Sequence, residues 1–247
     1  MKHNQPATKY RYYDFIMVAF VTVLLISNIA SSAKIIDWGV SIFGLRLAFD
    51  AGTILFPLSY IFGDVLTEVY GYRRGRRVIW MGFFCSGLMS LVLWIVGKMP
   101  AESGWAGAVG MERYNLILGG VSSGAIVLAS MTAYWAGEFS NSYILAKMKI
   151  ATQGRWLWTR TIGSTLVGEG IDTTIFISIA TILGVAGFSE AIWLNLIVTN
   201  YIFKCGIEAL MTPVTYVVVN FLKRAENSDY YDYDTDFNPF LISAGIK

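Results

Sequence analysis

Long apolar stretches, separated by short polar ones, run along almost the whole chain. Each stretch is close to the ~20 residues that an α-helix needs to cross a bilayer. Leu, Ile, Val and Phe follow one another without the strict alternation of a membrane strand, and backbone amides cannot stay unpaired in lipid. The pattern predicts an all-α integral membrane protein with six transmembrane helices, over residues 15–36, 47–70, 78–96, 116–138, 158–183 and 191–222.

The polar stretches suggest a simple domain organisation. Residues 1–224 form a single transmembrane domain, and residues 225–247 form an acidic, tyrosine-rich tail that we expect to be flexible and cytoplasmic. The first apolar stretch is too long for the core of a cleaved signal peptide, so it should stay in the mature chain. Residues 35–47 contain Gly39 and Gly44, which is compatible with a re-entrant or interfacial turn.

Composition excludes several classes of protein. Of the 247 residues, 55% are hydrophobic and 15% are charged, whereas a soluble domain draws about a quarter of its residues from charged types. The net charge of +2 gives no indication of a nucleic-acid-binding patch. The sole histidine is His3, both cysteines lie in apolar segments, and the chain has no Gly-Lys-Ser/Thr loop for ATP. We therefore expect no metal, no cofactor and no catalytic residue.

Lys and Arg are distributed unevenly between two sets of loops. Fourteen of the 19 fall in pieces that would share a side with the N-terminus, four fall in the other loops, and Lys204 lies within a span. Short cytoplasmic loops retain positive charge. The distribution predicts that both termini are cytoplasmic, which agrees with an even number of spans.

The informative anomaly is a set of ionisable residues inside the predicted spans. Each would cost roughly 3 kcal/mol if it were charged and exposed to lipid at the bilayer centre, so all should face an interior, a cavity or water. One buried lysine cannot neutralise seven acids. The set consists of Asp50, Asp64, Glu68, Glu138, Glu169, Asp172, Lys204 and Glu208.

Helical spacing gathers most of these residues on a few faces. Glu169 and Asp172 lie three residues apart, and Lys204 and Glu208 lie four apart, so each pair shares one helix face. One interpretation is polar packing, in which Lys204 pairs with an acid between helices. The other is a transport cavity whose ligand supplies the missing hydrogen-bond donors. The predicted substrate-binding residues are Asp64, Glu68, Glu138, Asn141, Glu169, Asp172, Lys204 and Glu208.

Two prolines fall within predicted spans. Pro57 lies near the middle of the second and Pro213 lies in the sixth. Proline removes one backbone hydrogen bond, so each is expected to kink its helix or to free a carbonyl that lines a cavity.

Four motifs together resemble a known family. They are PLSYIFGDVLTEVYGYRRGRRVIW from Pro57, GEFSNSYILAKMK from Gly137, TRTIGSTLVGEGIDTTIF from Thr159 and NYIFKCGIEALMTP from Asn200. This pattern, over about residues 15–224, resembles the queuosine precursor transporters, also called the putative vitamin uptake transporter family. The resemblance implies a six-helix inner-membrane importer of 7-deazaguanines such as preQ0, preQ1 or queuine. It also implies a fold similar to the substrate-binding subunits of energy-coupling-factor vitamin transporters.

Such a ligand would suit the buried acids. A guanine-like ring presents a ring N–H beside an exocyclic amine, and one carboxylate can accept both. Glu169 or Asp172 is our first choice for that contact. Lys204 or Asn141 would donate to the ring oxygen, and an acid such as Glu138 or Glu208 could pair with an aminomethyl cation.

Alternative functions and partners stay open at this point. The chain could be a vitamin-type binding subunit that requires a separate ATPase. It could also be an intramembrane aspartyl enzyme, since Asp64 follows Gly63 and Asp172 precedes Thr173 on another span. The expected partners are a purine-like small molecule and the lipid bilayer, with no nucleic acid. A homodimer is compatible with a helical carrier, although no interface is indicated.

Overall fold

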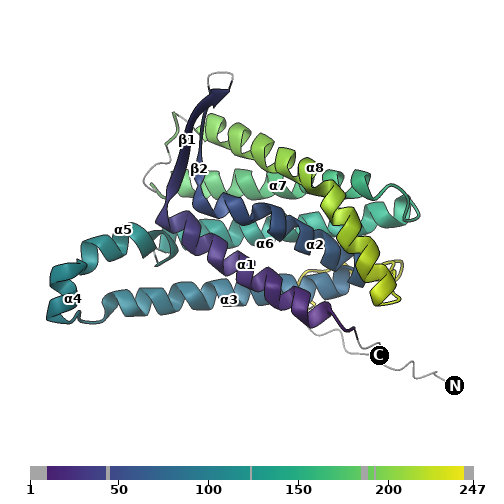
Figure 1. Cartoon of the computed structure of the whole chain (residues 1–247), viewed down its shortest axis with the longest axis horizontal. Coiled ribbons are helices and arrows are strands. Elements are labelled where there is room, and N and C mark those ends of the chain that lie inside the picture. The colour runs from purple at the N-terminus through teal and green to yellow at the C-terminus, as the bar shows by residue number, and fades with distance from the viewer. Residues whose placement is uncertain (1–9, 43–44, 123, 185–188, 192, 242–247) are drawn as a thin grey trace.

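The computed structural model describes residues 10–42, 45–122, 124–184, 189–191 and 193–241. Most of these residues form helices. The helices are α1 (Tyr13–Ala33), α2 (Phe56–Tyr70), α3 (Tyr72–Lys98), α4 (Ser103–Ala108), α5 (Gly110–Ser122), α6 (Gly124–Ala151), α7 (Leu157–Ile182) and α8 (Trp193–Ala225). Helices α3, α6 and α7 run along the long axis of the molecule, and α1 and α8 are inclined to it (Figure 1).

Four of the described helices are long and apolar enough to cross a membrane. They are α1, α3, α7 and α8, judged by length and composition. They coincide with the predicted first, third, fifth and sixth spans, as expected of a multi-pass helical membrane protein. Six crossings stay a prediction, because the other two predicted spans are divided differently in the structure.

The second predicted span, residues 47–70, is wrong in its first part. Strands β1 (Ile35–Ile42) and β2 (Leu45–Asp50) pair as an antiparallel hairpin, and a 3-10 turn, η1 (Ala51–Leu55), leads into α2. The hairpin replaces the expected turn, and residues 43–44, which include Gly44, lie outside the described part. Leu45, Leu47 and Phe49 alternate with more polar neighbours, which is the pattern of a strand. The mean hydropathy of the whole predicted span does not reveal this alternation.

Pro57 consequently has a different role from the expected one. It lies in the first turn of α2, where a helix tolerates proline because the missing N–H would have no partner anyway. Pro213, in contrast, lies inside α8 as predicted, and Figure 1 shows that α8 is bent along its length. Asp50 ends β2, and its side chain lies outside the described part.

The fourth predicted span, residues 116–138, joins parts of two helices. Helix α5 ends at Ser122 and α6 begins at Gly124, while residue 123 is outside the described part. The sequence around this junction, GGVSSG, is rich in glycine and serine, and both residue types weaken a helix interior. Helix α6 then continues to Ala151. This places Glu138 and Asn141 in the middle of α6 instead of at the end of a span.

Helices α6 and α7 approach each other closely at two glycines. A Cβ atom built on Gly137 would lie 2.7 Å from the Cβ of Asp172, and one on Gly168 would lie 2.7 Å from the Cβ of Asn141. Small residues permit such contact between helices in membranes. The crossing therefore brings the polar residues in the middle of α6 against those of α7.

The start of α1 and the end of α8 lie at the same end of the bundle, opposite α4 and the hairpin (Figure 1). Glu226 connects them, since its carboxylate accepts hydrogen bonds from the backbone N–H groups of Arg11 and Tyr12. The tail was expected to be flexible, but its described part, residues 226–241, packs against this end. The Asp232 carboxylate accepts from the Tyr72 N–H, and Trp80 donates to the Pro239 carbonyl.

Candidate functional site

The centre of the candidate site is an ion-paired triad on α7 and α8. The Nζ of Lys204 lies 2.8 Å from Glu169 Oε2 and 2.8 Å from Asp172 Oδ2. The three side chains are only 11%, 12% and 26% exposed, respectively. The i, i+3 spacing on α7 places both acids on the face that meets α8, which confirms that Lys204 pairs with acids between helices.

Glu138 and Asn141 enter this site from α6. The Gly137 and Gly168 contacts hold α6 against α7 at the level of Asp172. On its other side Glu138 approaches α2, because a Cβ built on Gly63 would lie 3.4 Å from Glu138 Oε2. The four central helices α2, α6, α7 and α8 therefore all contribute to one polar region.

Asp64 of α2 and Glu208 of α8 complete the region. Asp64 is 1% exposed and Glu208 is 0% exposed. The Asn141 amide donates to Asp64 Oδ1 at 3.4 Å, which is a long hydrogen bond. The Asp64 and Glu208 carboxyls face each other where α2 packs on α8, and Glu169 is within electrostatic reach of Glu208.

The assembled group has too few hydrogen-bond donors for its acceptors. We call it the acid cluster, and it consists of Asp64, Glu138, Asn141, Glu169, Asp172, Lys204 and Glu208. Five carboxylates surround one lysine, although buried polar groups normally find partners. Among the described side chains, buried oxygens without a hydrogen-bond partner include Asp64 Oδ2, Glu138 Oε2, Asn141 Oδ1 and both carboxylate oxygens of Glu208. The acid cluster can therefore accept hydrogen bonds from a ligand rich in N–H groups.

Glu68, the eighth predicted residue, lies one turn from Asp64 on α2 but has different partners. Arg160 Nε donates to its Oε2 at 2.7 Å and Arg160 Nη2 to its Oε1 at 2.8 Å. Lys223 Nζ lies 2.5 Å and Lys149 Nζ 3.5 Å from the same Oε1. Glu68 is 0% exposed, and both of its oxygens are occupied. The structure thus separates it from the acid cluster.

The tail completes the ion pairs around Glu68. Asp229 Oδ1 lies 2.6 Å from Lys149 Nζ and 2.8 Å from Lys223 Nζ. Partial burial alone would raise the pKa of Asp229, but hydrogen bonds from the two lysines lower it below its usual value. We call this group, Glu68, Lys149, Arg160, Lys223 and Asp229, the Glu68 network.

Sequence reasoning missed the cations of the Glu68 network. Lys149 and Arg160 were counted among positive loop charges that set orientation, yet each is 1% exposed. The available signal was Glu68 itself, because a buried acid near the end of a helix requires a cation from another segment. Nothing in the spacing indicated which of the nearby cations would reach it.

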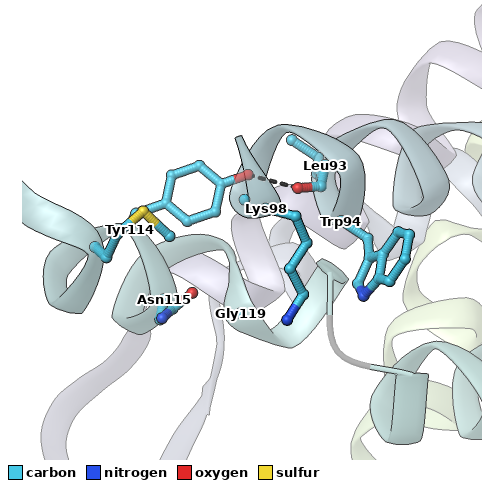
Figure 2. Close-up of a pocket in the computed structure, with 8 residues that line it drawn as sticks. Leu93, Trp94, Lys98, Tyr114, Asn115 and Gly119 are labelled. Atoms are coloured by element: carbon cyan, nitrogen blue, oxygen red, sulfur yellow. Dashed lines mark hydrogen bonds between the residues drawn. The ribbon is translucent and has the colours of Figure 1, made fainter. Parts of the chain in front are cut away.

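Two cavities in the described part of the chain lie elsewhere. One, of about 350 Å³, lies between α3 and α5. Figure 2 shows Lys98 and Trp94 on one side of it and Asn115 and Tyr114 on the other. The second, of about 410 Å³, lies at the end of α8 beside Lys223 and Asp229. Neither is lined by the acid cluster, so a water-filled chamber around the carboxylates stays a prediction.

Fold and site together define a class of protein. The chain is a multi-pass helical membrane protein whose buried charges gather between helices, as they do in membrane transporters. A sequence profile of the family described as "Putative vitamin uptake transporter" matches residues 50–218, and the chain belongs to this family.

Curated relatives cover most of the chain. It is 26% identical over 218 residues to a "Probable queuosine precursor transporter" of Bacillus subtilis (strain 168), covering 87% of this chain and 86% of the relative. It is 25% identical over 197 residues to the "Queuosine precursor transporter" of Escherichia coli (strain K12), covering 79% and 83%. No solved structure matches the chain. The family therefore indicates a transporter with a small-molecule substrate.

Proposed function

We propose that the protein imports queuosine precursors, 7-deazaguanines such as preQ0, preQ1 or queuine, into the cytoplasm. The observation that carries this proposal is the excess of buried acceptors over donors in the acid cluster. A 7-deazaguanine presents ring N–H and amine donors, which such acceptors would bind. The printed names of the relatives support the same class of cargo.

We infer the contacts of the cargo from the acid-cluster oxygens that have no hydrogen-bond donor among the described residues. Lys204 already donates to Glu169 and Asp172, so it holds these carboxylates between α7 and α8. Within the described part of the chain, Glu138 Oε2 and Asn141 Oδ1 receive no hydrogen bond. We propose that Glu138 and Asn141 bind the ring together with Glu169, Asp172 and Lys204. Glu68 is assigned a structural role because all its acceptor capacity is engaged.

Location and topology form part of the same proposal. We place the protein in the inner membrane, with six crossings and both termini in the cytoplasm. Support comes from the uneven distribution of Lys and Arg and from the contact of Glu226 with the start of α1. A homodimer and a fold like that of energy-coupling-factor binding subunits also belong to the proposal.

The test is uptake in cells that cannot synthesise queuosine precursors and lack their own carrier. With the protein expressed, exogenous preQ1 should restore queuosine in tRNA. Asp172→Asn and Glu169→Gln should abolish this restoration while the variants remain in the membrane fraction. Glu112→Gln, at an exposed position of α5, is the matched control and should behave like the wild type. Absence of restoration by expressed wild-type protein would refute the proposal.

The two other functions considered from the sequence make different predictions. A binding subunit that depends on an ATPase would bind preQ1 but would not transport it after reconstitution alone. An intramembrane aspartyl enzyme would need Asp64 and Asp172 to act together. In the structure Asp172 pairs with Lys204, whereas Asp64 contacts Asn141 and faces Glu208. We therefore propose that the protein is not an enzyme, and cleavage of a reporter peptide lost in Asp64→Asn would reverse that view.

A further inference from the structure

The contact between Asp64 and Glu208 is unusual because it joins two carboxyl groups. Both side chains are buried, at 1% and 0% exposure. Asp64 Oδ2 and both Glu208 oxygens receive no hydrogen bond. Among the described side chains, the one donor to the pair is the Asn141 amide, 3.4 Å from Asp64 Oδ1. Such a pair lacks the donors that would stabilise two negative charges.

The charged groups around the pair do not supply compensation. Asp64 faces Glu138 of α6 and Glu68 of its own helix, and Glu208 faces Glu169 of α7. Lys204 lies one turn away on α8 but donates to Glu169 and Asp172. Among the described residues of α1 and α3, which also pack on α2, none contributes a charge to this contact.

Two adjacent carboxylates in this environment cannot both be ionised, because burial and mutual repulsion each disfavour the second charge. A proton held between them removes the repulsion and turns one carboxyl group into a donor for the other. The geometry therefore describes a proton-binding site within the membrane.

We propose that Asp64 and Glu208 bind a proton that is transported together with the cargo, so that the proton gradient drives import. This proposal rests on the proposed function, since the same cluster would bind the cargo through Glu138, Asn141 and the Lys204 triad. The step is a protonation: one carboxylate of the pair gains an O–H bond when a proton enters from one side of the membrane, and that bond breaks when the proton leaves on the other side.

The Glu68 network is the neighbouring charged group along α2. Asp64 lies one turn, about 6 Å, from Glu68 along α2. The three cations of the network are engaged by Glu68 and Asp229, so the network does not compensate a charge on Asp64. Water that reached the pair from this end of the bundle would accept the proton there.

The experiment uses the purified full chain in proteoliposomes, with the membrane potential held at zero by valinomycin and potassium. A gradient of about one pH unit, alkaline inside, supports about tenfold accumulation of radiolabelled preQ1 if one proton accompanies each cargo molecule. A pH-sensitive dye in the lumen should report acidification when preQ1 is added outside. Exchange of labelled for unlabelled preQ1 without a gradient is measured in parallel.

Each outcome distinguishes the two proposals. Exchange by the wild type together with gradient-driven accumulation and acidification supports proton coupling. Exchange without either response overturns proton coupling and leaves the proposed function intact. Absence of exchange as well refutes the proposed function.

Variants then locate the coupling. In Asp64→Asn and in Glu208→Gln, the ratio of gradient-driven accumulation to exchange should fall about tenfold, to the value without a gradient. In Glu112→Gln the ratio should match that of the wild type. An unchanged ratio in both carboxyl variants would exclude the pair as the proton site. If a variant does not fold, the dye measurement on the wild type still decides whether a proton moves with the cargo.

Discussion

The acid cluster and the Glu68 network are both buried groups of charges between the same four helices, yet they differ in how well they are satisfied. In the Glu68 network, three cations serve two acids, and both Glu68 oxygens have close donors. In the acid cluster, one lysine serves five acids, and several oxygens have no donor. The two groups are only one helical turn apart at Asp64 and Glu68.

This difference is the basis on which we propose a structural role for the Glu68 network and a binding role for the acid cluster. A saturated network of buried charges holds helices together and has no acceptor left for a ligand. A group with surplus acceptors is unfavourable in the absence of protons or cargo, which is why we propose the acid cluster as the binding site. Glu68 and Asp64 are both buried acids, so burial and charge do not distinguish them. The number of hydrogen-bond donors around each carboxylate does.

Glu68→Ala is expected to have the largest effect, because it removes the acid that three buried cations share. Breaking a buried ion pair by deleting one partner typically costs about 3–5 kcal/mol, so little folded protein should remain. The measurement is the yield and thermal unfolding midpoint of monodisperse protein in detergent, with the exposed Glu112→Ala as the control. A normal midpoint combined with loss of preQ1 binding would move Glu68 into the cargo site.

Glu138→Gln should affect binding more than folding. The change keeps the shape of the side chain but removes the charge of an acceptor that has no donor in the protein. Hydrogen bonds to charged groups contribute about 1.5–3 kcal/mol, so preQ1 affinity should fall about 10- to 150-fold. Equilibrium binding of labelled preQ1 to purified protein measures this. A marked loss of stability with unchanged affinity would contradict the assignment.

Gly168→Ala tests the acid cluster without altering any charge. The added methyl would lie 2.7 Å from the Cβ of Asn141, so α6 and α7 would have to separate. Overpacking of this kind typically costs about 1–3 kcal/mol. We expect weaker preQ1 uptake and a lower unfolding midpoint, with Gly206→Ala, where a Cβ meets nothing within 4 Å, as the control. Equal behaviour of the two variants would show that the close crossing is dispensable.

Asp229→Asn should have the smallest effect, because the side chain is 44% exposed and solvent screens its ion pairs. Exposed pairs contribute up to about 1 kcal/mol. The pKa of Asp229 is lowered in the folded protein from its usual 3.8. Its contribution is therefore complete above that value and is lost as the pH falls through the lower folded pKa.

The measurement for Asp229 is the unfolding midpoint as a function of pH. The wild type should exceed Asp229→Asn by a small, constant margin near neutral pH, and the two curves should converge under strongly acidic conditions. A margin that grows as the pH falls would contradict the assigned ion pairs.

The sequence predicted that these polar residues gather between the helices, but not how they divide into two groups. Seven of the eight candidate residues converge in the acid cluster, because helical spacing and the cost of lipid-exposed charge restrict where such residues can point. The β-hairpin and the start of α2 at Phe56 were missed. An apolar average over about 20 residues does not distinguish a membrane helix from an alternating strand followed by a short helix.

The sequence by itself determined that this is a helical membrane protein with too many acids in its interior, because hydropathy and the cost of burying charge are properties of the residues alone. Only the tertiary structure decided which acid meets which partner. Lys149, Arg160 and Lys223 come from three helices and reach Glu68, whereas Lys204 reaches Glu169 and Asp172. Those distances depend on how closely α6 and α7 cross and on where α8 bends, and neither is encoded in the spacing along one helix.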